Sequence, residues 1–142
     1  MGRAVALISS TSASAGAERI VAVRGEIDVG NAPSLREWLM RASDAGRRSV
    51  VVDLRSVQFL AISGLYVLCD EQQRMVPHRA RLTVVCTDAR ALQLFSVCRL
   101  EEVLHVVSSP EDAAAAEPWS PEDDSRAARL GEWLARYAAE SA

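Results

Sequence analysis

Short runs of apolar and β-branched residues recur along the chain and predict the strands of a sheet. Two of these runs, "SVVVDL" and "RLTVVC", are nearly uninterrupted, which is typical of strands covered on both faces. The five predicted strands are residues 3–8, 18–24, 49–54, 81–86 and 103–107. In the second strand we expect Ile20 and Ala22 to face the core. Between the first two strands we expect the small polar residues 9–17 to form a turn.

Between the later strands, apolar residues recur at the spacing of amphipathic helices. Asn31 stands where the N-cap of a helix over residues 32–44 is expected. A second helix follows the third strand and ends at Pro77, and a third helix begins at Thr87 and Asp88. The predicted apolar face of the second helix consists of Leu65, Leu68, Cys69, Gln72 and Val76. This alternation predicts an α/β fold with a mixed, mostly parallel sheet of four to five strands flanked by helices.

The composition changes after the last predicted strand, and this change divides a domain over residues 1–108 from a C-terminal extension over residues 109–142. In the extension, Ser109-Pro110 and Ser120-Pro121 each precede two acidic residues. A serine cap, a proline in the first turn and acids near the positive end of the dipole predict two short helices. The apolar stripe of the second helix consists of Leu130, Trp133, Leu134 and Tyr137. This stripe either packs back onto the domain or docks a partner or a second copy, which would form a homodimer.

Composition and charge exclude several classes of partner and cofactor. The formal net charge is −3, so the chain lacks the cationic excess typical of nucleic-acid binding. The three cysteines, Cys69, Cys86 and Cys98, lie in apolar stretches without a C-x-x-C pair, which indicates core residues in a reducing compartment and no metal site. The apolar run after Arg3 is shorter than the ~7–15 residues of a signal, and no run reaches the ~18 residues of a membrane span. We expect a cytoplasmic protein without cofactors.

The sequence also argues against an enzyme. Only His78 and His105 offer acid–base groups that titrate near neutral pH, and the first follows a helix-breaking proline while the second lies in a predicted strand. Neither G-x-x-x-x-G-K-[ST] nor G-x-G-x-x-G, the two phosphate-binding loops, occurs in the chain. We therefore expect an interaction module.

Two segments, "GEIDVGNAPSLREWL" at 25–39 and "VVVDLRSVQFLAISGLYVL" at 50–68, together with the strand–helix–strand pattern at 82–107, resemble the STAS domain. Within that family they are most similar to the bacterial anti-sigma factor antagonists, also called anti-anti-sigma factors. The resemblance implies a small α/β domain that regulates transcription and has no catalysis of its own. It also implies an ATPase-fold anti-sigma factor as partner, which in the family is the kinase that phosphorylates the antagonist.

The phosphorylation motif of the family is altered in this chain. The family carries Asp-Ser-Ser/Thr-Gly, with the phosphorylated hydroxyl directly after the Asp. The resemblance places Ala61 at the Asp and Ile62 at the phosphoacceptor, while Ser63 and Gly64 match the motif. Isoleucine cannot be phosphorylated, so the usual charge switch is missing. Ser63 remains an alternative phosphoacceptor, although its hydroxyl is more simply explained as a helix cap.

The resemblance also assigns a candidate partner-binding surface. It consists of Asp28, Asn31, Ala61, Ile62, Ser63, Gly64 and Tyr66. Ile62 either contributes an exposed apolar contact or tucks into the core of a chain that no longer engages a kinase. Asp28 either contacts the partner or forms an Asx-type turn that helps to cap the first helix. Two functions follow: an antagonist that works without phosphorylation, or a STAS subunit repurposed in another complex or as a small-ligand sensor.

Overall fold

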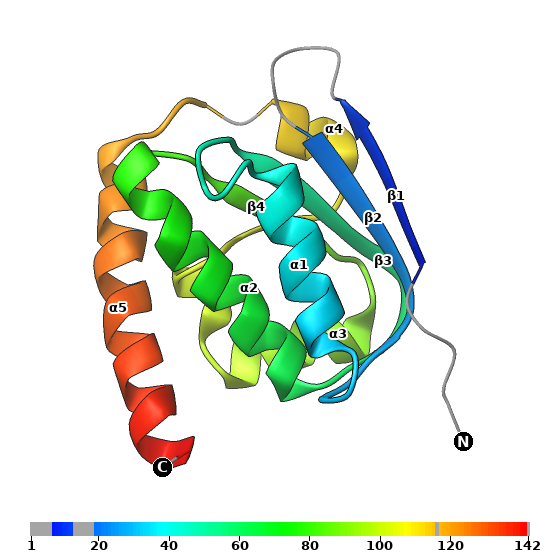
Figure 1. The fold of residues 1–142 in the computed structure, drawn as a ribbon. Coiled ribbons are helices and arrows are strands. Elements are labelled where there is room, and N and C mark those ends of the chain that lie inside the picture. Colours follow the sequence, from blue (N-terminus) through cyan, green and yellow to red (C-terminus); the bar gives the residue numbers. More distant parts are fainter. Residues whose placement is uncertain (1–6, 13–18, 116, 142) are drawn as a thin grey trace.

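Five strands form one mixed sheet in the computed structural model, which describes residues 7–12, 19–115 and 117–141 (Figure 1). The strands are β1 (Leu7–Ser12), β2 (Arg19–Ile27), β3 (Val50–Leu60), β4 (Leu82–Val85) and β5 (His105–Val107). They lie in the order β1-β2-β3-β4-β5, with β1 antiparallel to β2 and each later pair parallel. The predicted mixed and mostly parallel sheet is confirmed.

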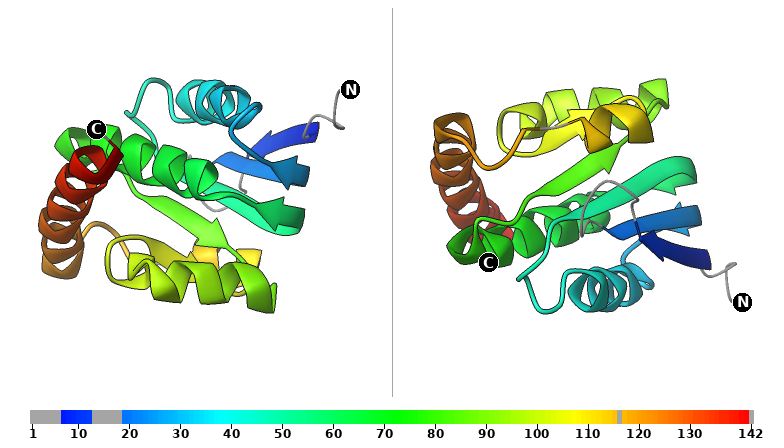
Figure 2. Two further views of the ribbon diagram at one scale, coloured as in Figure 1. Left: turned by 90° about the horizontal axis from the view of Figure 1, so that it is seen from below. Right: turned by 90° about the horizontal axis from the view of Figure 1, so that it is seen from above.

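Helices cover both faces of this sheet and one of its edges (Figure 2). They are α1 (Ala32–Ala42), α2 (Ile62–Met75), α3 (Ala89–Val97), α4 (Pro110–Ala114) and α5 (Pro121–Ser141), with short 3-10 turns η1 (Val76–His78) and η2 (Leu100–Glu102). α1 and α2 pack on one face, and α3 and α4 lie on the other. Such a layered arrangement lets a central strand bury both of its faces, and every residue of β4 is buried.

The main core lies between the sheet and the helices α1 and α2. Val21, Val23 and Val52 from the sheet are almost fully buried there, as are Leu35 of α1 and Leu68 of α2. A smaller cluster of Val51, Val85 and Ala113 lies under α4, and Ile20 packs against it. The expectation that Ile20 and Ala22 face the main core is therefore wrong, because the strand alternation places Val21 and Val23 on that face.

Two predicted boundaries also need correction. Residues 9–12, predicted as part of a turn, belong to β1, where Ser9 to Ser12 pair with the first residues of β2. Residues 3–6 and 13–17 lie outside the described residues. β3 runs to Leu60, six residues beyond its predicted end, because its second half continues to pair with β2 up to the Ile27–Leu60 register.

The apolar stripe of the extension packs back onto the domain. Leu130 is fully buried in the main core, and Trp133 and Leu134 pack against it. α5 runs beside α2, and the Tyr137 ring stacks on Tyr66 at a centroid distance of 4.5 Å (Figure 1). The second predicted helix is longer than expected, and a homodimer through it stays a prediction. Among the described helices, none combines the length and the apolar content of a membrane span.

Candidate functional site

The corner between β3 and α2 is fixed by the neighbouring strand. Ala61 separates the two elements, and its backbone N–H donates a 2.9 Å hydrogen bond to the carbonyl of Ile27, the last residue of β2. Ala61 has an extended backbone and occupies the N-cap position of α2, but its methyl group cannot accept a hydrogen bond from the helix. The first turn of α2 therefore begins without a side-chain cap.

Ile62, the first residue of α2, points away from the core. Its side chain is 48% exposed, and Phe59 beside it is 54% exposed. Both line an apolar groove of about 550 Å³ between the end of β3 and α3. Other residues of this groove are Leu54, Val57, Leu60, Ala91 and Leu94, with Asp88 and Arg90 as its charged members. Of the two alternatives from the sequence, an exposed contact or a side chain tucked into the core, the structure shows the exposed one.

Ser63 and Gly64 differ from each other in their surroundings. The sequence predicted Ser63 as the cap of α2, and this prediction is wrong. Ser63 is the second residue of the helix, and Ala61 occupies the N-cap position. Its hydroxyl oxygen is buried and has no hydrogen-bond partner among the described residues. Gly64 is buried where the helix approaches the sheet, and a Cβ there would lie 2.8 Å from methyl carbons of both Ile27 and Leu60. A glycine is required at this close approach, since those carbons belong to the packed core.

The loop between β2 and α1 lies next to the corner, because Asp28 directly follows the residue that anchors Ala61. Asp28 Oδ1 accepts hydrogen bonds from the backbone N–H groups of Gly30 (2.9 Å) and Asn31 (3.1 Å), which confirms the Asx-type turn. Asn31 occupies the N-cap position, but its side chain does not cap α1. It accepts from the Asp28 N–H and donates to the Glu26 carbonyl, so it closes the loop instead. Val29, at the tip, is 80% exposed.

The ring of Tyr66, another residue of the predicted partner surface, is covered by α5. Its ring stacks on Tyr137, which in turn stacks on Trp133 at 5.5 Å. The guanidinium of Arg36 lies 5.9 Å from the Tyr66 ring centroid, within reach of a cation–π contact. The sequence did not predict this cover, because it depends on the path of α5 in three dimensions.

A second polar group lies between α1 and α2, away from the corner. Glu71 is almost fully buried there and pairs with Arg36 and Arg74, and Arg36 also pairs with Asp70. Burial raises the pKa of Glu71, and the positive charges of Arg74 and Arg36 offset this only in part. These contacts join the two helices that carry the loop and the corner.

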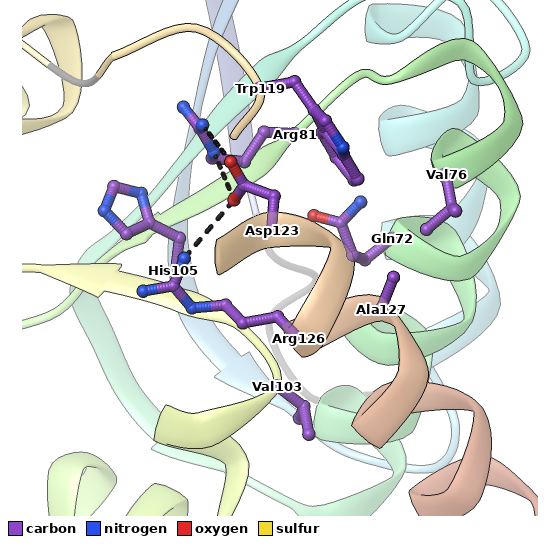
Figure 3. Close-up of a pocket in the computed structure, with 9 residues that line it drawn as sticks. All are labelled: Gln72, Val76, Arg81, Val103, His105, Trp119, Asp123, Arg126 and Ala127. Atoms are coloured by element: carbon purple, nitrogen blue, oxygen red, sulfur yellow. Dashed lines mark hydrogen bonds and ion pairs between the residues drawn. The ribbon is translucent and has the colours of Figure 1, made fainter. Parts of the chain in front are cut away.

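His105 and the three cysteines are buried or partly buried, whereas His78 is exposed. His105 contacts Thr83 Oγ1 at 3.2 Å, and burial and the nearby Arg81 charge lower its pKa. The three cysteines are free thiols whose pKa values burial raises, which disfavours the reactive thiolate. The cavity beside His105 measures about 10 Å³, room for no more than about one water (Figure 3). Among the described residues, no cluster of three or more His, Cys, Asp or Glu side chains is placed to hold a metal ion.

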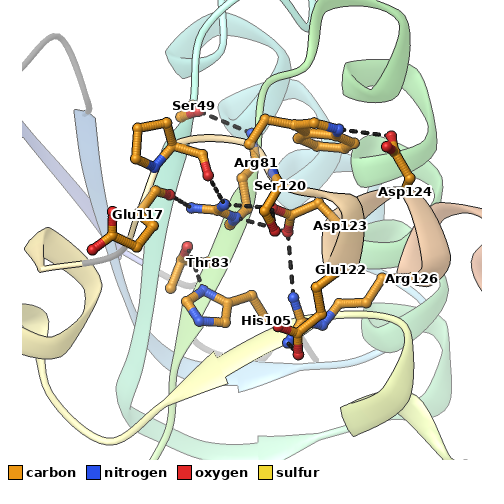
Figure 4. A network of polar contacts seen from close by, with 12 residues as sticks. Ser49, Arg81, Thr83, His105, Glu117, Ser120, Glu122, Asp123, Asp124 and Arg126 are labelled. Atoms are coloured by element: carbon orange, nitrogen blue, oxygen red, sulfur yellow. Dashed lines mark hydrogen bonds and ion pairs between the residues drawn. The ribbon is translucent and has the colours of Figure 1, made fainter.

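An ion pair fastens the start of α5 to the sheet (Figure 4). Arg81 binds both carboxylate oxygens of Asp123, at 3.1 and 2.6 Å, and also donates to the carbonyls of Glu117 and Pro118. Asp123 is 4% exposed and accepts a further bond from the Ser120 N–H. Burial alone would raise the pKa of Asp123, but the hydrogen bonds from Arg81 and Ser120 outweigh it and lower the pKa to about 2.

This pKa predicts a loss of stability in acid. An unfolded Asp titrates near pH ~3.9, so the contribution of Asp123 is complete above that pH and disappears as the pH falls through about 2. We expect the free energy of unfolding of the native chain to exceed that of Asp123→Asn by a margin that shrinks by about 2 kcal/mol over this range. Urea denaturation of both proteins from neutral to strongly acid pH measures the margin. A margin independent of pH would contradict the assignment, since the other carboxylates are common to both chains.

Comparisons with known proteins agree with this architecture. The model of the STAS domain matches residues 10–113, and the chain belongs to that family. The anti-sigma-B factor antagonist of Staphylococcus aureus (strain NCTC 8325 / PS 47) is 28% identical over 91 residues, which cover 64% of this chain and 84% of the relative. α5 lies outside the residues that the family model matches.

Solved structures of antagonists share the fold. An anti-sigma factor antagonist from Mycobacterium paratuberculosis superposes with a TM-score of 0.68 at 21% identity, over 76% of this chain and 90% of that one. The antagonist SpoIIAA in its unphosphorylated form gives 0.58 at 12% identity, over 76% and 94%. The chain is therefore a STAS domain that is similar in sequence and fold to anti-sigma factor antagonists.

Proposed function

We propose that this chain is an anti-sigma factor antagonist that works without phosphorylation at the family position and has no catalytic activity. Its partner is an ATPase-fold anti-sigma factor, which it binds through the corner between β3 and α2. The observation that carries the proposal is the exposed Ile62 at the position of the phosphoacceptor. An apolar side chain there contributes to binding at all times, because no kinase can convert it into a dianion.

The distribution of exposed apolar side chains supports this surface. Among the described residues, the large apolar side chains that remain exposed are Val29, Phe59, Ile62, Leu92 and Val97. Phe59 and Ile62 belong to the corner, and Val29 lies in the adjoining loop. Leu92 and Val97 belong to α3, the helix across the groove. Phe59 and Ile62 line the same groove, and neighbouring exposed apolar side chains of this kind are typical of a protein interface.

The first test is direct binding. The purified full-length chain is mixed with ATP and the ATPase-fold anti-sigma factors of the same organism, and each mixture is analysed for complex formation and for the intact mass of the chain. A stable complex with an unmodified chain is the expected result. The absence of any complex would refute the antagonist function, and a phosphorylated chain would refute phosphorylation independence alone.

Restoring the family motif provides a second test. The double variant Ala61→Asp, Ile62→Ser is expected to gain one phosphate in the presence of the partner and ATP, because it places a hydroxyl beside the unpaired N–H groups and positive dipole of α2. The single variant Ala61→Asp is the control, since it has the acid but no new hydroxyl. Phosphate on both variants would instead locate the modification at Ser63 or elsewhere.

The groove beside Ile62 supports a second candidate, a sensor of a small ligand. Its volume of about 550 Å³ lies in the range of ligand pockets, and its lining is mostly apolar with Arg90 able to bind an anionic group. An apolar carboxylic acid fits this description. Native mass spectrometry of the chain purified from its own organism tests this candidate, and a protein free of any bound small molecule would count against it.

A further inference from the structure

Ile62 also lines a second groove. It has a volume of about 430 Å³ and lies between α5 and the end of α3 with the following turn. Its lining includes Ile62 and Val97, the latter 73% exposed, together with Trp133 of α5. Ile62 lines both grooves, so the second groove continues the surface proposed above into the C-terminal extension.

Arginines dominate the charge of this second groove. Arg99, Arg129 and Arg136 line it, against Glu102 and Glu132. All three arginines are exposed, and none of them forms an ion pair with a carboxylate of the described residues. The groove is thus lined by more basic than acidic side chains, although the whole chain has a net charge of −3. A guanidinium group binds a carboxylate in bidentate geometry. Arginines that have no carboxylate partner and lie beside apolar side chains therefore suit a partner that is both acidic and apolar.

The spacing of these residues suits a helix of the partner. Arg129 and Arg136 are seven residues apart on α5, which corresponds to ~10 Å along the helix axis. Trp133 lies between them and is held in place by the bond from its indole N–H to the Cys98 carbonyl at 3.0 Å. A partner helix that lies along α5 with two acids seven residues apart and apolar side chains between them would match both arginines and the tryptophan.

We infer that the C-terminal helix supplies half of the partner-binding surface, and that the groove between α3 and α5 receives an acidic amphipathic helix of the anti-sigma factor. This inference rests on the proposed function. Because α5 lies outside the residues matched by the family model, the extension gives this chain contacts beyond those of the matched domain. The stacking of Tyr137 on Tyr66 then holds α5 beside the corner.

Charge reversal on α5 tests this inference in the full-length chain. The double variant Arg129→Glu, Arg136→Glu is expected to bind the purified anti-sigma factor at least about tenfold more weakly, with a smaller dependence on salt, because complementary charges across an interface are lost. The matched control is Arg47→Glu, Arg48→Glu, which reverses two exposed arginines in the turn before β3, at the opposite end of that strand. Circular dichroism and urea denaturation establish that both variants remain folded.

The outcomes separate this inference from the function on which it rests. Weaker binding by the α5 variant, with binding by the control unchanged, supports the inference. Native affinity in the α5 variant overturns it and leaves the antagonist function intact, as does an equal loss in the control, which would reflect net charge alone. If the native chain binds no anti-sigma factor, the proposed function is refuted, and the inference is refuted with it.

Discussion

Replacing Asp123 with alanine is expected to lower the free energy of unfolding by about 3 kcal/mol, the lower end of the range for breaking a buried ion pair. The side chains of Asp123 and its partner Arg81 are 5% and 13% exposed, so removal of the carboxylate leaves a guanidinium that water reaches poorly. The loss stays near the lower end because Arg81 keeps its bonds to the carbonyls of Glu117 and Pro118. Urea denaturation followed by tryptophan fluorescence measures the change.

Glu122→Ala is the matched control for this prediction. Glu122 is the neighbouring acid in the same first turn of α5, and its only described ion pair is the exposed i,i+4 contact with Arg126. Exposed pairs of this kind contribute about 0.3–0.5 kcal/mol, so the control should remain close to native. Equal losses in the two variants would show that Arg81 and Asp123 do not fasten α5 to the sheet.

The sequence predicted best the elements whose burial is complete. The runs "RLTVVC" and "SVVVDL" predicted the positions of β4 and the start of β3 because strands covered on both faces are apolar at nearly every residue. β1 was misplaced for the opposite reason. Its residues from Ser9 to Ser12 are small and polar, and their strand conformation follows from backbone pairing with β2, which leaves no apolar pattern in the sequence.

The corner shows the same division between local and non-local causes. The Asx-type turn at Asp28 depends on residues within three positions of it and was predicted. The caps of α1 and α2 were not predicted correctly. Asn31 bonds to Asp28 and Glu26 instead of to the helix, and Ala61 is positioned by Ile27 of another strand. The cover over Tyr66 comes from Tyr137, and neither residue carries a local pattern that reveals the other.

Replacing Ile62 with aspartate is expected to weaken binding to the anti-sigma factor by about 2 kcal/mol or more, close to the burial free energy of one large apolar side chain plus the desolvation of a carboxylate. The free energy of unfolding should not decrease. Ile62 is half exposed, and an acid in the first turn of α2 interacts favourably with the helix dipole by about 0.3–1 kcal/mol. A variant that is as stable as the native chain and yet binds at least tenfold more weakly therefore separates the contact from the scaffold.

Gln73→Asp is the control for Ile62→Asp, because it adds the same charge to an exposed position of the same helix, three turns from the corner. Isothermal titration calorimetry against the purified partner compares both variants with the native chain. If the control binds normally and Ile62→Asp does not, the weaker binding is local to this corner, where the variant loses an apolar contact and gains a negative charge. The chain would then have kept the partner surface at this corner and lost the phosphoacceptor and the acid before it, which are Ile62 and Ala61 here. Native affinity for Ile62→Asp would instead place the partner elsewhere on the molecule.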